Sequence, residues 1–546
     1  ISMWVRADGW SGRNPVTGAP GTIFPRGTTN VIFQDGIIWG GLVRDGHSPT
    51  LRAGGQRFNA GTVPGRIISK GLAEDPNSPD VRIWRIRRDY QTADLKQDAA
   101  ELNNIPIEEV TEAQIQGVRQ QYEKDWNQWP WQKGAPFYDD NGNGVLDAGE
   151  ERGLVRADQV VWFVANDLDS SAVEIFFGSQ PIGLEMQVTL WGYKQPNGLQ
   201  NAIFKRYRLI YKGTATTPDT AHIDSMYVAQ WSDPDLGTLS DDFVGSDSVL
   251  SLGYVYNADV ADKRFIEFDL TPPAVGYDFL QGPIVPGSAG DMAIFDFNKI
   301  AGFRNLPMTS FGFLTPESVP FEPPCPGSFE CTLSLWNFLR GFVPTSNPNN
   351  PKRFTTVDGE PTNFPLAGDP LTGEGDIDGK VFPPGDRRIF LSSGPFTMAL
   401  GDTQEVIIAL VGGLGANRLF SIEVMKHYVK WARQLYRNNF ELPPEPQPEE
   451  PPLPNHFRLS QNYPNPFNPG TEIRYELPVE RHVNLTIYNV LGQKIKTLVD
   501  EVKEAGTHSV TWNSTDEDGQ PVPSGIYFYR FDAGVVSGTK KMILRR

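Results

Sequence analysis

Apolar and polar residues alternate over many short runs of this chain, and a period of two is typical of strands with one buried face. Gly and Pro residues interrupt the runs, as turns between strands require. The pattern predicts strands at residues 30–33, 81–85, 160–164, 186–191, 204–211, 225–230, 265–268 and 405–411. Residues 1–440 are therefore expected to form a mainly β body. It is either one elaborated β-sandwich or two packed sandwich subdomains, since no repeat of fixed period indicates a propeller or a solenoid.

Two segments of the body follow the period of an α-helix instead. The first begins at Thr111, which forms a capping box with Gln114, and Pro130 ends it. Its apolar face consists of Ile115, Val118, Tyr122, Trp126 and Trp129. The second covers roughly residues 418–438, and its apolar face consists of Ile422, Met425, Val429, Ala432 and Leu435. We expect both faces to cover the hydrophobic core.

A proline-rich segment separates the body from the end of the chain. Residues 441–455 contain seven prolines and four glutamates, which favours an extended, semi-rigid linker of the polyproline II type. Alternation with a period of two then returns at Ile473, Tyr475, Leu477, Val483, Leu485, Ile487, Tyr527, Tyr529 and Phe531. Several short strands in so small a segment predict a small Ig-like β-sandwich over residues 456–546.

Five motifs occur within this C-terminal segment, at residues 462–469, 487–493, 505–513, 524–530 and 540–546. In order and spacing they resemble the C-terminal sorting domain of cargo proteins of the type IX secretion system, which occurs in Bacteroidota and related bacteria. The resemblance implies export across the outer membrane and recognition of residues 456–546 by the secretion machinery. It also implies an extracellular or outer cell-surface location. The alternative is a further β-domain without a sorting role.

Composition agrees with a place outside the cell. The net charge is −17, and residues before 456 carry −18, because the C-terminal segment balances eleven Lys and Arg against ten Asp and Glu. An acidic body argues against a nucleic-acid partner, since phosphate binding requires basic patches. No apolar run is long enough for a transmembrane segment. The chain starts at Ile1 instead of Met, which fits a processed N-terminus.

The chain has two cysteines, Cys325 and Cys331, in the segment PPCPGSFEC. They are close enough in sequence to close a small loop, and in an oxidising compartment we expect them to form a disulfide. Two free thiols are the alternative.

The clearest chemical motif is DDNGNGVLDAGE at residues 139–150, which resembles the twelve-residue calcium loop of an EF-hand. Gly144 stands at the sixth position, where such a loop turns sharply. The expected Ca²⁺ ligands are Asp139, Asn141, Asn143, the backbone carbonyl of Val145, Asp147 and Glu150. Prolines and glycines break the incoming helix and a strand-like run follows, so we expect a single structural calcium loop. An acidic turn without metal is the alternative.

A second acidic stretch covers residues 231–247. If the chain folds back at Gly237, a second group of carboxylates would converge on Ca²⁺: Asp233, Asp235, Asp241, Asp242 and Asp247. A solvated acidic turn is equally compatible with the sequence. Together with residues 272–283, this stretch resembles segments of large surface proteins of the same bacteria, whose activity is unknown.

An aromatic cluster lies between the first helix and the calcium loop: Trp126, Trp129, Trp131, Phe137 and Tyr138. Such rings either pack around the loop, which we favour, or stack on sugars. HExxH, GxSxG, P-loop, CxxC and dinucleotide motifs are absent from the sequence. The leading hypothesis is thus a calcium-stabilised structural or adhesive surface protein that self-assembles, for example as a homo-oligomer. The alternatives are a secreted hydrolase of polysaccharide or protein, and a non-catalytic carbohydrate-binding protein with a glycan partner.

Overall fold

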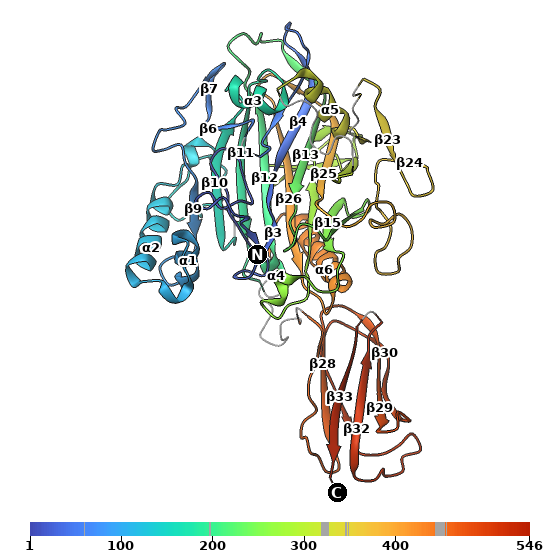
Figure 1. Cartoon of the computed structure of the whole chain (residues 1–546). Helices are drawn as coiled ribbons and strands as arrows, with labels where there is room; N and C mark the ends of the chain where they lie inside the picture. The colour runs from blue at the N-terminus through green and yellow to red at the C-terminus, as the bar shows by residue number, and fades with distance from the viewer. Residues whose placement is uncertain are drawn as a thin grey trace.

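The computed structural model describes residues 1–58, 60–154, 156–195, 198–317, 327–343, 347, 349–442, 454, 456–534 and 536–545. Antiparallel sheets dominate these residues, and a few helices lie against them (Figure 1). The mainly β class that the alternation of apolar and polar residues predicts is confirmed.

A nine-stranded antiparallel sheet forms one half of the body. Its order is β14 (Asp242–Asp247), β15 (Leu252–Asn257), β16 (Ala274–Gln281), β26 (Thr403–Gly413), β12 (Ala202–Tyr211), β11 (Leu184–Gly192), β10 (Gln159–Asn166) and β6 (Val63–Pro64), and β9 (Trp84–Arg87) also pairs with β10. The central strands are buried on both faces, because the second sheet covers one face and a helix covers the other.

A five-stranded sheet forms the other half, in the order β21 (Ser310–Leu314), β25 (Arg388–Ala399), β13 (His222–Asp233), β4 (Gln34–Arg44) and β5 (Leu51–Gly55). The two sheets share one hydrophobic core. Trp39, Val228 and Leu391 enter it from the five-stranded sheet, whereas Met186 and Ile408 enter it from the nine-stranded sheet. Residues of both sheets thus pack together as the two layers of a β-sandwich.

Helix α6 (Arg418–Arg437) covers the outer face of the nine-stranded sheet. The side chain of Asn417 caps it by accepting hydrogen bonds from the backbone N–H groups of Leu419 and Phe420. Met425 and Val429 on its apolar face are buried in the same cluster as β-strand residues of the sheet. The second helix that the sequence predicts is confirmed.

The first predicted helix is α2 (Glu112–Asn127), which follows α1 (Lys96–Asn103) in an insertion between β9 and β10. The expected capping box is present: the Thr111 hydroxyl accepts a bond from the Gln114 N–H, and the Thr111 N–H donates to the Gln114 side chain. The two helices enclose a small hydrophobic cluster of their own, which contains Leu95 and Tyr122. Figure 1 shows the insertion at the side of the sandwich.

The expectation of only two helices is wrong. The described residues also contain α3 (Ser170–Phe177), α4 (Lys263–Ile266) and α5 (Phe329–Leu339). Helices α3 and α5 are short, so neither repeats its apolar positions over enough turns to predict a helix. The strand expected at residues 265–268 is wrong as well, because Asp262 caps α4 by accepting from the N–H groups of Arg264 and Phe265.

Short elements complete the body. The N-terminal segment forms a three-stranded sheet of β1 (Ser2–Met3), β2 (Thr22–Ile23) and β3 (Asn30–Ile32). The other short strands are β7 (Ile67–Ser69), β8 (Leu72–Ala73), β17 (Ile284–Pro286), β18 (Met292–Phe295), β19 (Asn298–Ala301), β20 (Phe303–Asn305), β22 (Phe342–Val343), β23 (Lys352–Thr355) and β24 (Pro361–Thr362). Single 3₁₀ turns lie at Ile107–Glu109, Trp131–Lys133 and Leu199–Asn201.

The C-terminal domain is a small sandwich of two antiparallel sheets, as the sequence predicts. One sheet has the order β27 (Arg458–Leu459), β28 (Thr471–Leu477) and β31 (Gly506–Trp512). The other has the order β30 (Lys494–Lys503), β29 (Arg481–Asn489), β32 (Gly525–Asp532) and β33 (Ser537–Leu544). Tyr475, Leu485, Trp512 and Tyr529 are fully or almost fully buried between the sheets.

The predicted linker at residues 441–455 lies almost wholly outside the described residues, which include only 441, 442 and 454 of it. The domain that follows the linker contacts the body at α6, where the rings of Phe420 and Phe457 are 4.2 Å apart. An ion pair of 2.8 Å joins Arg481 of β29 to Glu423 of α6. Figure 1 shows the C-terminal strands in red beyond this helix.

Candidate functional site

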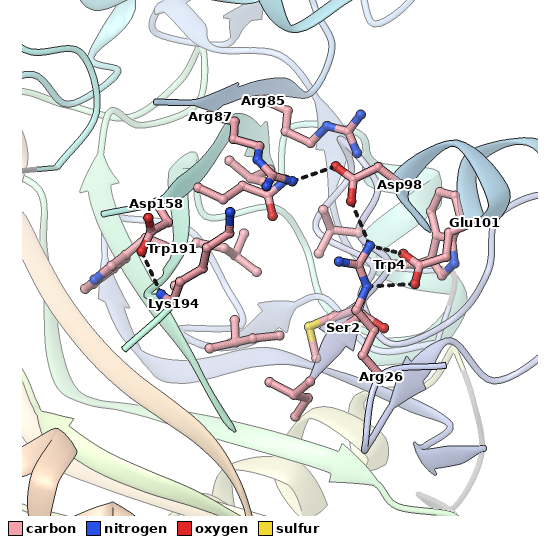
Figure 2. A pocket seen from close by; sticks show the side chains of 18 of the residues that line it. Ser2, Trp4, Arg26, Arg85, Arg87, Asp98, Glu101, Asp158, Trp191 and Lys194 are labelled. Carbon is pink, nitrogen blue, oxygen red and sulfur yellow. Dashed lines mark hydrogen bonds and ion pairs between the residues drawn. The ribbon is translucent and has the colours of Figure 1, made fainter. Parts of the chain in front are cut away.

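A cavity of about 980 Å³ opens between the N-terminal strands, the helical insertion and one end of the nine-stranded sheet. Its wall combines side chains that are distant in sequence: Arg26 follows β2, Arg85 and Arg87 belong to β9, Asp98 and Glu101 belong to α1. Figure 2 shows these side chains around the cavity. No motif in the sequence marks the cavity, because its residues come from separate elements.

Asp98 is the central acid of this wall. The Arg26 guanidinium binds its Oδ1 atom at 2.8 Å, and Arg87 binds its Oδ2 atom at 3.2 Å. Arg26 also pairs with Glu101. Burial alone would raise the pKa of Asp98, but the hydrogen bonds and charges of the two arginines outweigh it and lower the pKa. Asp98 therefore stays ionised and is not a proton donor near neutral pH.

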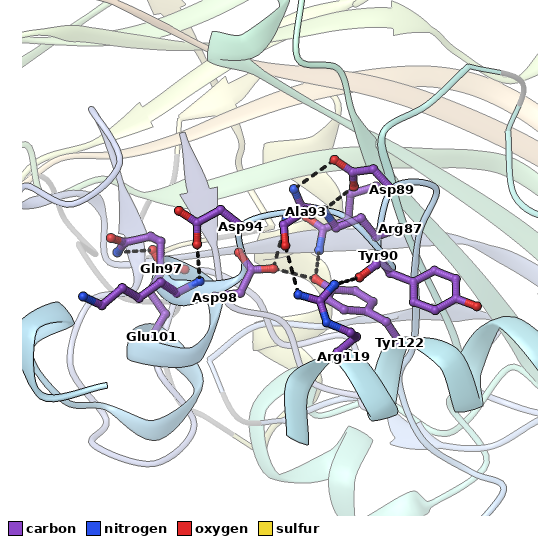
Figure 3. Close-up of polar contacts among 12 residues, drawn as sticks. Arg87, Asp89, Tyr90, Ala93, Asp94, Gln97, Asp98, Glu101, Arg119 and Tyr122 are labelled. Carbon is purple, nitrogen blue, oxygen red and sulfur yellow. Dashed lines mark hydrogen bonds and ion pairs between the residues drawn. The ribbon is translucent and has the colours of Figure 1, made fainter. Parts of the chain in front are cut away.

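The helical insertion holds this wall in place. Tyr122 of α2 donates a hydrogen bond to Asp98 at 2.8 Å, and the Gln159 amide donates to the Tyr122 oxygen at 2.8 Å. Arg119 donates to the backbone carbonyls of Tyr90 and Ala93, which lie in the loop before α1 (Figure 3). Burial raises the pKa of Tyr122, so its hydroxyl keeps its proton. The hydrogen bonds of Tyr122 and Arg119 thus hold Asp98 and the loop before α1 in place.

Arg85 differs from the other bases around the cavity. Lys194 pairs with Asp89 at 2.6 Å, and Asp89 also binds Arg87. The Arg85 guanidinium lies over the ring of Tyr122 at 4.5 Å and makes no ion pair with a described residue. Arg85 is thus a guanidinium without an ion pair to a described residue, and the groups around it are charged pairs and amides. Such a cavity suits a ligand rich in hydroxyl groups or one that carries a single negative charge.

The predicted calcium loop at residues 139–150 is held by hydrogen bonds among its own residues, although its carboxylates do not form a group of three within 4.8 Å of one another. The Asp139 carboxylate accepts from the N–H groups of Asn143 and Gly144, at 3.1 and 2.6 Å. The side chains of Asn141 and Asn143 both donate to Asp147, at 2.9 and 2.7 Å. Each of the five predicted side-chain ligands makes a hydrogen bond within the loop. Gly144 has the left-handed φ of 74° that the turn requires.

Glu150 closes the loop. Its carboxylate accepts from the N–H of Asp140 at 3.0 Å and from the N–H of Asp147 at 2.9 Å, and only 7 % of the residue is exposed. The side chain of Val145 is exposed, so its part as a ligand rests on the backbone carbonyl alone. Carboxylate and amide oxygens are the donors that Ca²⁺ prefers, so the residue types of the loop fit calcium.

Only part of the second predicted group comes together. Asp233 and Asp235 lie beside Asp386, which the sequence analysis missed because it is distant in the chain and has no spacing signal. Asp247 instead pairs with Lys426 of α6 at 3.0 Å.

The two other acids of that stretch have different surroundings. Asp242 is fully buried, and burial raises its pKa far above the ordinary value. Asp241 lies near Asp259 and Asp262, and burial together with these two acids raises the pKa of Asp241 to about 6.

Cys325 lies outside the described residues, and so does the predicted disulfide. Cys331 is buried on α5. The aromatic cluster packs against protein. The indole N–H of Trp129 donates to the Pro136 carbonyl, and the rings of Trp131 and Phe137 lie edge to face at 5.8 Å. Tyr138 is the exposed member of the cluster.

Comparison with known proteins identifies the C-terminal domain only. The family model of the FlgD Ig-like domain matches residues 468–534, so an Ig-like domain lies at this end of the chain. A search of curated protein sequences found no match. Within the described residues, no helix is both long and apolar enough to span a membrane.

Three solved structures are similar to parts of the chain. FlgD of P. aeruginosa is 21 % identical, with 14 % of this chain and 57 % of that chain covered and a TM-score of 0.12. A polysaccharide lyase is 8 % identical, with 66 % and 34 % covered and a TM-score of 0.19. PorZ, a surface component of the type IX secretion system of Porphyromonas gingivalis, is 12 % identical, with 75 % and 47 % covered and a TM-score of 0.13. The chain spans about a third to little more than half of these proteins. TM-scores this low carry no argument about the body.

Proposed function

We propose that this protein is cargo of the type IX secretion system and acts outside the cell as a structural or adhesive protein. Residues 456–546 serve as its export domain, and Ca²⁺ held by residues 139–150 stabilises the body. The single observation that carries the proposal is the Ig-like domain, in which the five motifs of the sequence belong to one folded unit.

Contacts between the motifs support this assignment. The Asn462 N–H of the first motif donates to the Tyr529 hydroxyl of the fourth at 2.9 Å. Phe467 of the first motif is buried and contacts the ring of Trp512 in the third at 5.6 Å. Its backbone N–H and C=O groups are bonded to Ile543 and Arg545 of the last motif, each at 3.0 Å. Residues of different motifs thus contact one another and hold the domain together.

Two apolar residues of the second motif are not packed inside the domain. Val490 and Leu491 form the turn after β29 and are 63 % and 79 % exposed. Exposed apolar side chains that do not support the fold are typical of a surface that another protein recognises. We infer that this turn contacts the secretion machinery.

Cell fractionation of the full chain tests the proposal in a host with type IX secretion. The variant Val490→Ser with Leu491→Ser should remain in the periplasm, although the purified protein melts at the unchanged temperature. Val502→Ser is the matched control, because Val502 is an equally apolar residue of the same domain and 59 % exposed. The control should be exported. Export of the double variant at the level of the unaltered protein would contradict the role of the turn.

A second candidate function is binding of a carbohydrate in the cavity beside α1 and α2. The observation in its favour is the mixed wall of amides, paired charges and one unpaired base, Arg85. Hydrolysis would require a carboxyl group that holds its proton near neutral pH, and the lowered pKa of Asp98 favours binding over hydrolysis.

A glycan array tests this candidate with the purified chain. Arg85→Gln should lose any signal that the unaltered chain gives. Arg88→Gln should retain it, because Arg88 pairs with Glu151 at 2.7 Å and does not line the cavity. Equal binding by both variants, or no binding by the unaltered chain, would remove this candidate.

Self-assembly on the cell surface is the remaining part of the proposal. Electron microscopy of material taken from cells tests it directly. Fibres or sheets are the expected result, and dispersed single particles would contradict it.

A further inference from the structure

Two adjacent strands of the five-stranded sheet bring three carboxylates together at one edge of the body. Ser232 of β13 pairs with Ile389 of β25, so the residues that follow the first strand lie beside those that precede the second. Asp233 ends β13, Asp235 follows it, and Asp386 comes two residues before β25. One carboxylate oxygen from each of the three residues lies within 4.8 Å of the others.

Among the described residues, two arginines lie near this group of acids. Arg388 is 3.2 Å from Asp233 and 3.8 Å from Asp386, and Arg57 acts on Asp233. Burial raises the pKa of Asp233 to about 6, with Arg388 opposing and Asp386 adding to the rise. Burial raises the pKa of Asp235 to about 7, and the two neighbouring carboxylates contribute. Carboxylates this close repel each other unless one of them is protonated or a cation lies between them.

A fourth carboxylate gives independent support. Asp242 is 0 % exposed, and its Oδ2 atom accepts from the Leu236 N–H at 3.3 Å. Its Oδ1 atom is buried and receives no hydrogen bond from the described residues. The charges of Asp235 and Asp386 act on it, so it lies near the group, although its oxygens are not among those within 4.8 Å of one another. A buried oxygen without a partner carries the full cost of its lost hydration, which a nearby cation would offset.

We infer that Asp233, Asp235 and Asp386, with Asp242 behind them, form a second cation site that binds Ca²⁺ and fastens β13 to β25. With all four carboxylates ionised and the two arginines counted against them, the formal charge of the site is −2, which one divalent ion neutralises. Its donors are all carboxylate oxygens, without His or Cys, and this favours Ca²⁺ over transition metals. The site is separate from the loop at residues 139–150 and does not depend on the proposed export.

Calcium titration of the full chain by calorimetry tests the site. The loop is first disabled by Asp139→Asn with Glu150→Gln, so that any remaining binding comes from elsewhere. The probe is CaCl₂ alone. This background should still bind one Ca²⁺ per chain, and adding Asp235→Asn with Asp386→Asn should abolish that binding. Asp224→Asn is the matched control, because Asp224 lies on the same strand and pairs with one arginine, Arg44, at 3.1 Å.

Thermal unfolding separates a cation site from an ordinary network of ion pairs. Without calcium, Asp235→Asn with Asp386→Asn should raise the melting temperature, because it removes carboxylate repulsion, and it should abolish the rise that calcium causes. Asp386→Asn alone serves if the double variant does not fold, because the side chain of Asp386 is 25 % exposed. The inference is overturned if the background binds no Ca²⁺, or if binding survives the Asp235 and Asp386 substitutions.

Discussion

Lys205 of β12 and Asp35 of β4 form an ion pair inside the sandwich, where it joins the nine-stranded sheet to the five-stranded one. The two side chains are 1 % and 0 % exposed. Tyr277 of β16 donates a hydrogen bond to the same carboxylate at 2.8 Å, and Lys205 also contacts the Ser11 hydroxyl at 3.3 Å. Because both charges have left water, the pair depends on this network of partners.

Replacement of Lys205 by Met should destabilise the body by about 3–5 kcal/mol, because Asp35 would remain as a buried charge without its cation. Adding Asp35→Asn should restore much of this loss, since the amide needs no counter-charge. Urea unfolding measures both free energies. A double variant as unstable as Lys205→Met alone would show that packing, and not charge, explains the loss.

Replacement of Asp89 by Asn should lower stability at neutral pH by about 0.5–1 kcal/mol, the amount typical of a pair that water screens. Burial favours the protonated acid, but the hydrogen bonds from Arg87 and Lys194 outweigh burial and lower the pKa of Asp89 to about 2, from 3.8. The ionised form is thus favoured by folding above about pH 4, and this contribution is lost as the pH falls toward 2. Unfolding free energies measured at pH 7 and at pH 2 should therefore differ between the variant and the unaltered chain only at pH 7. The control variant is Asp80→Asn, because the side chain of Asp80 is 71 % exposed.

Removal of calcium should lower the melting temperature of the body, because an ion that binds only the folded chain stabilises it by about 2.7 kcal/mol at a hundred times its Kd. Glu150→Gln should reduce the difference between melting curves with CaCl₂ and with EDTA. The neighbouring variant Glu151→Gln should not, since Glu151 pairs with Arg88 outside the loop. Identical melting curves of the unaltered chain in CaCl₂ and EDTA would refute calcium binding by the loop.

The elements that the sequence predicted well are those whose periods are long and undisturbed. Helix α2 has a capping box at Thr111 and one apolar face, and α6 has a regular stripe over its whole length. Helix α5 was not predicted because its buried side includes the polar residues Thr332, Ser334 and Asn337, so its apolar residues do not form a regular stripe. The short helix α4 depends on the cap at Asp262, which apolar alternation in the same residues conceals.

The candidate sites also differ in whether the sequence alone could predict them. The loop at residues 139–150 could be proposed from the sequence because all its expected ligands lie within twelve residues at fixed spacing. The proximity of Asp235 to Asp386 was not predictable, because it depends on the register between β13 and β25. The cavity was not predictable either, because Arg26 and Asp98 meet through the packing of the N-terminal strands against α1.

Fusion of residues 456–546 to an inert reporter tests the central claim most directly, because it separates the C-terminal domain from everything the body contributes. The fusion is expressed in a host with type IX secretion and in the same host with that system inactivated, and the reporter is measured in periplasm, cell surface and medium. The account predicts reporter on the surface or in the medium of the first host and in the periplasm of the second. Reporter that stays in the periplasm of both hosts would contradict it.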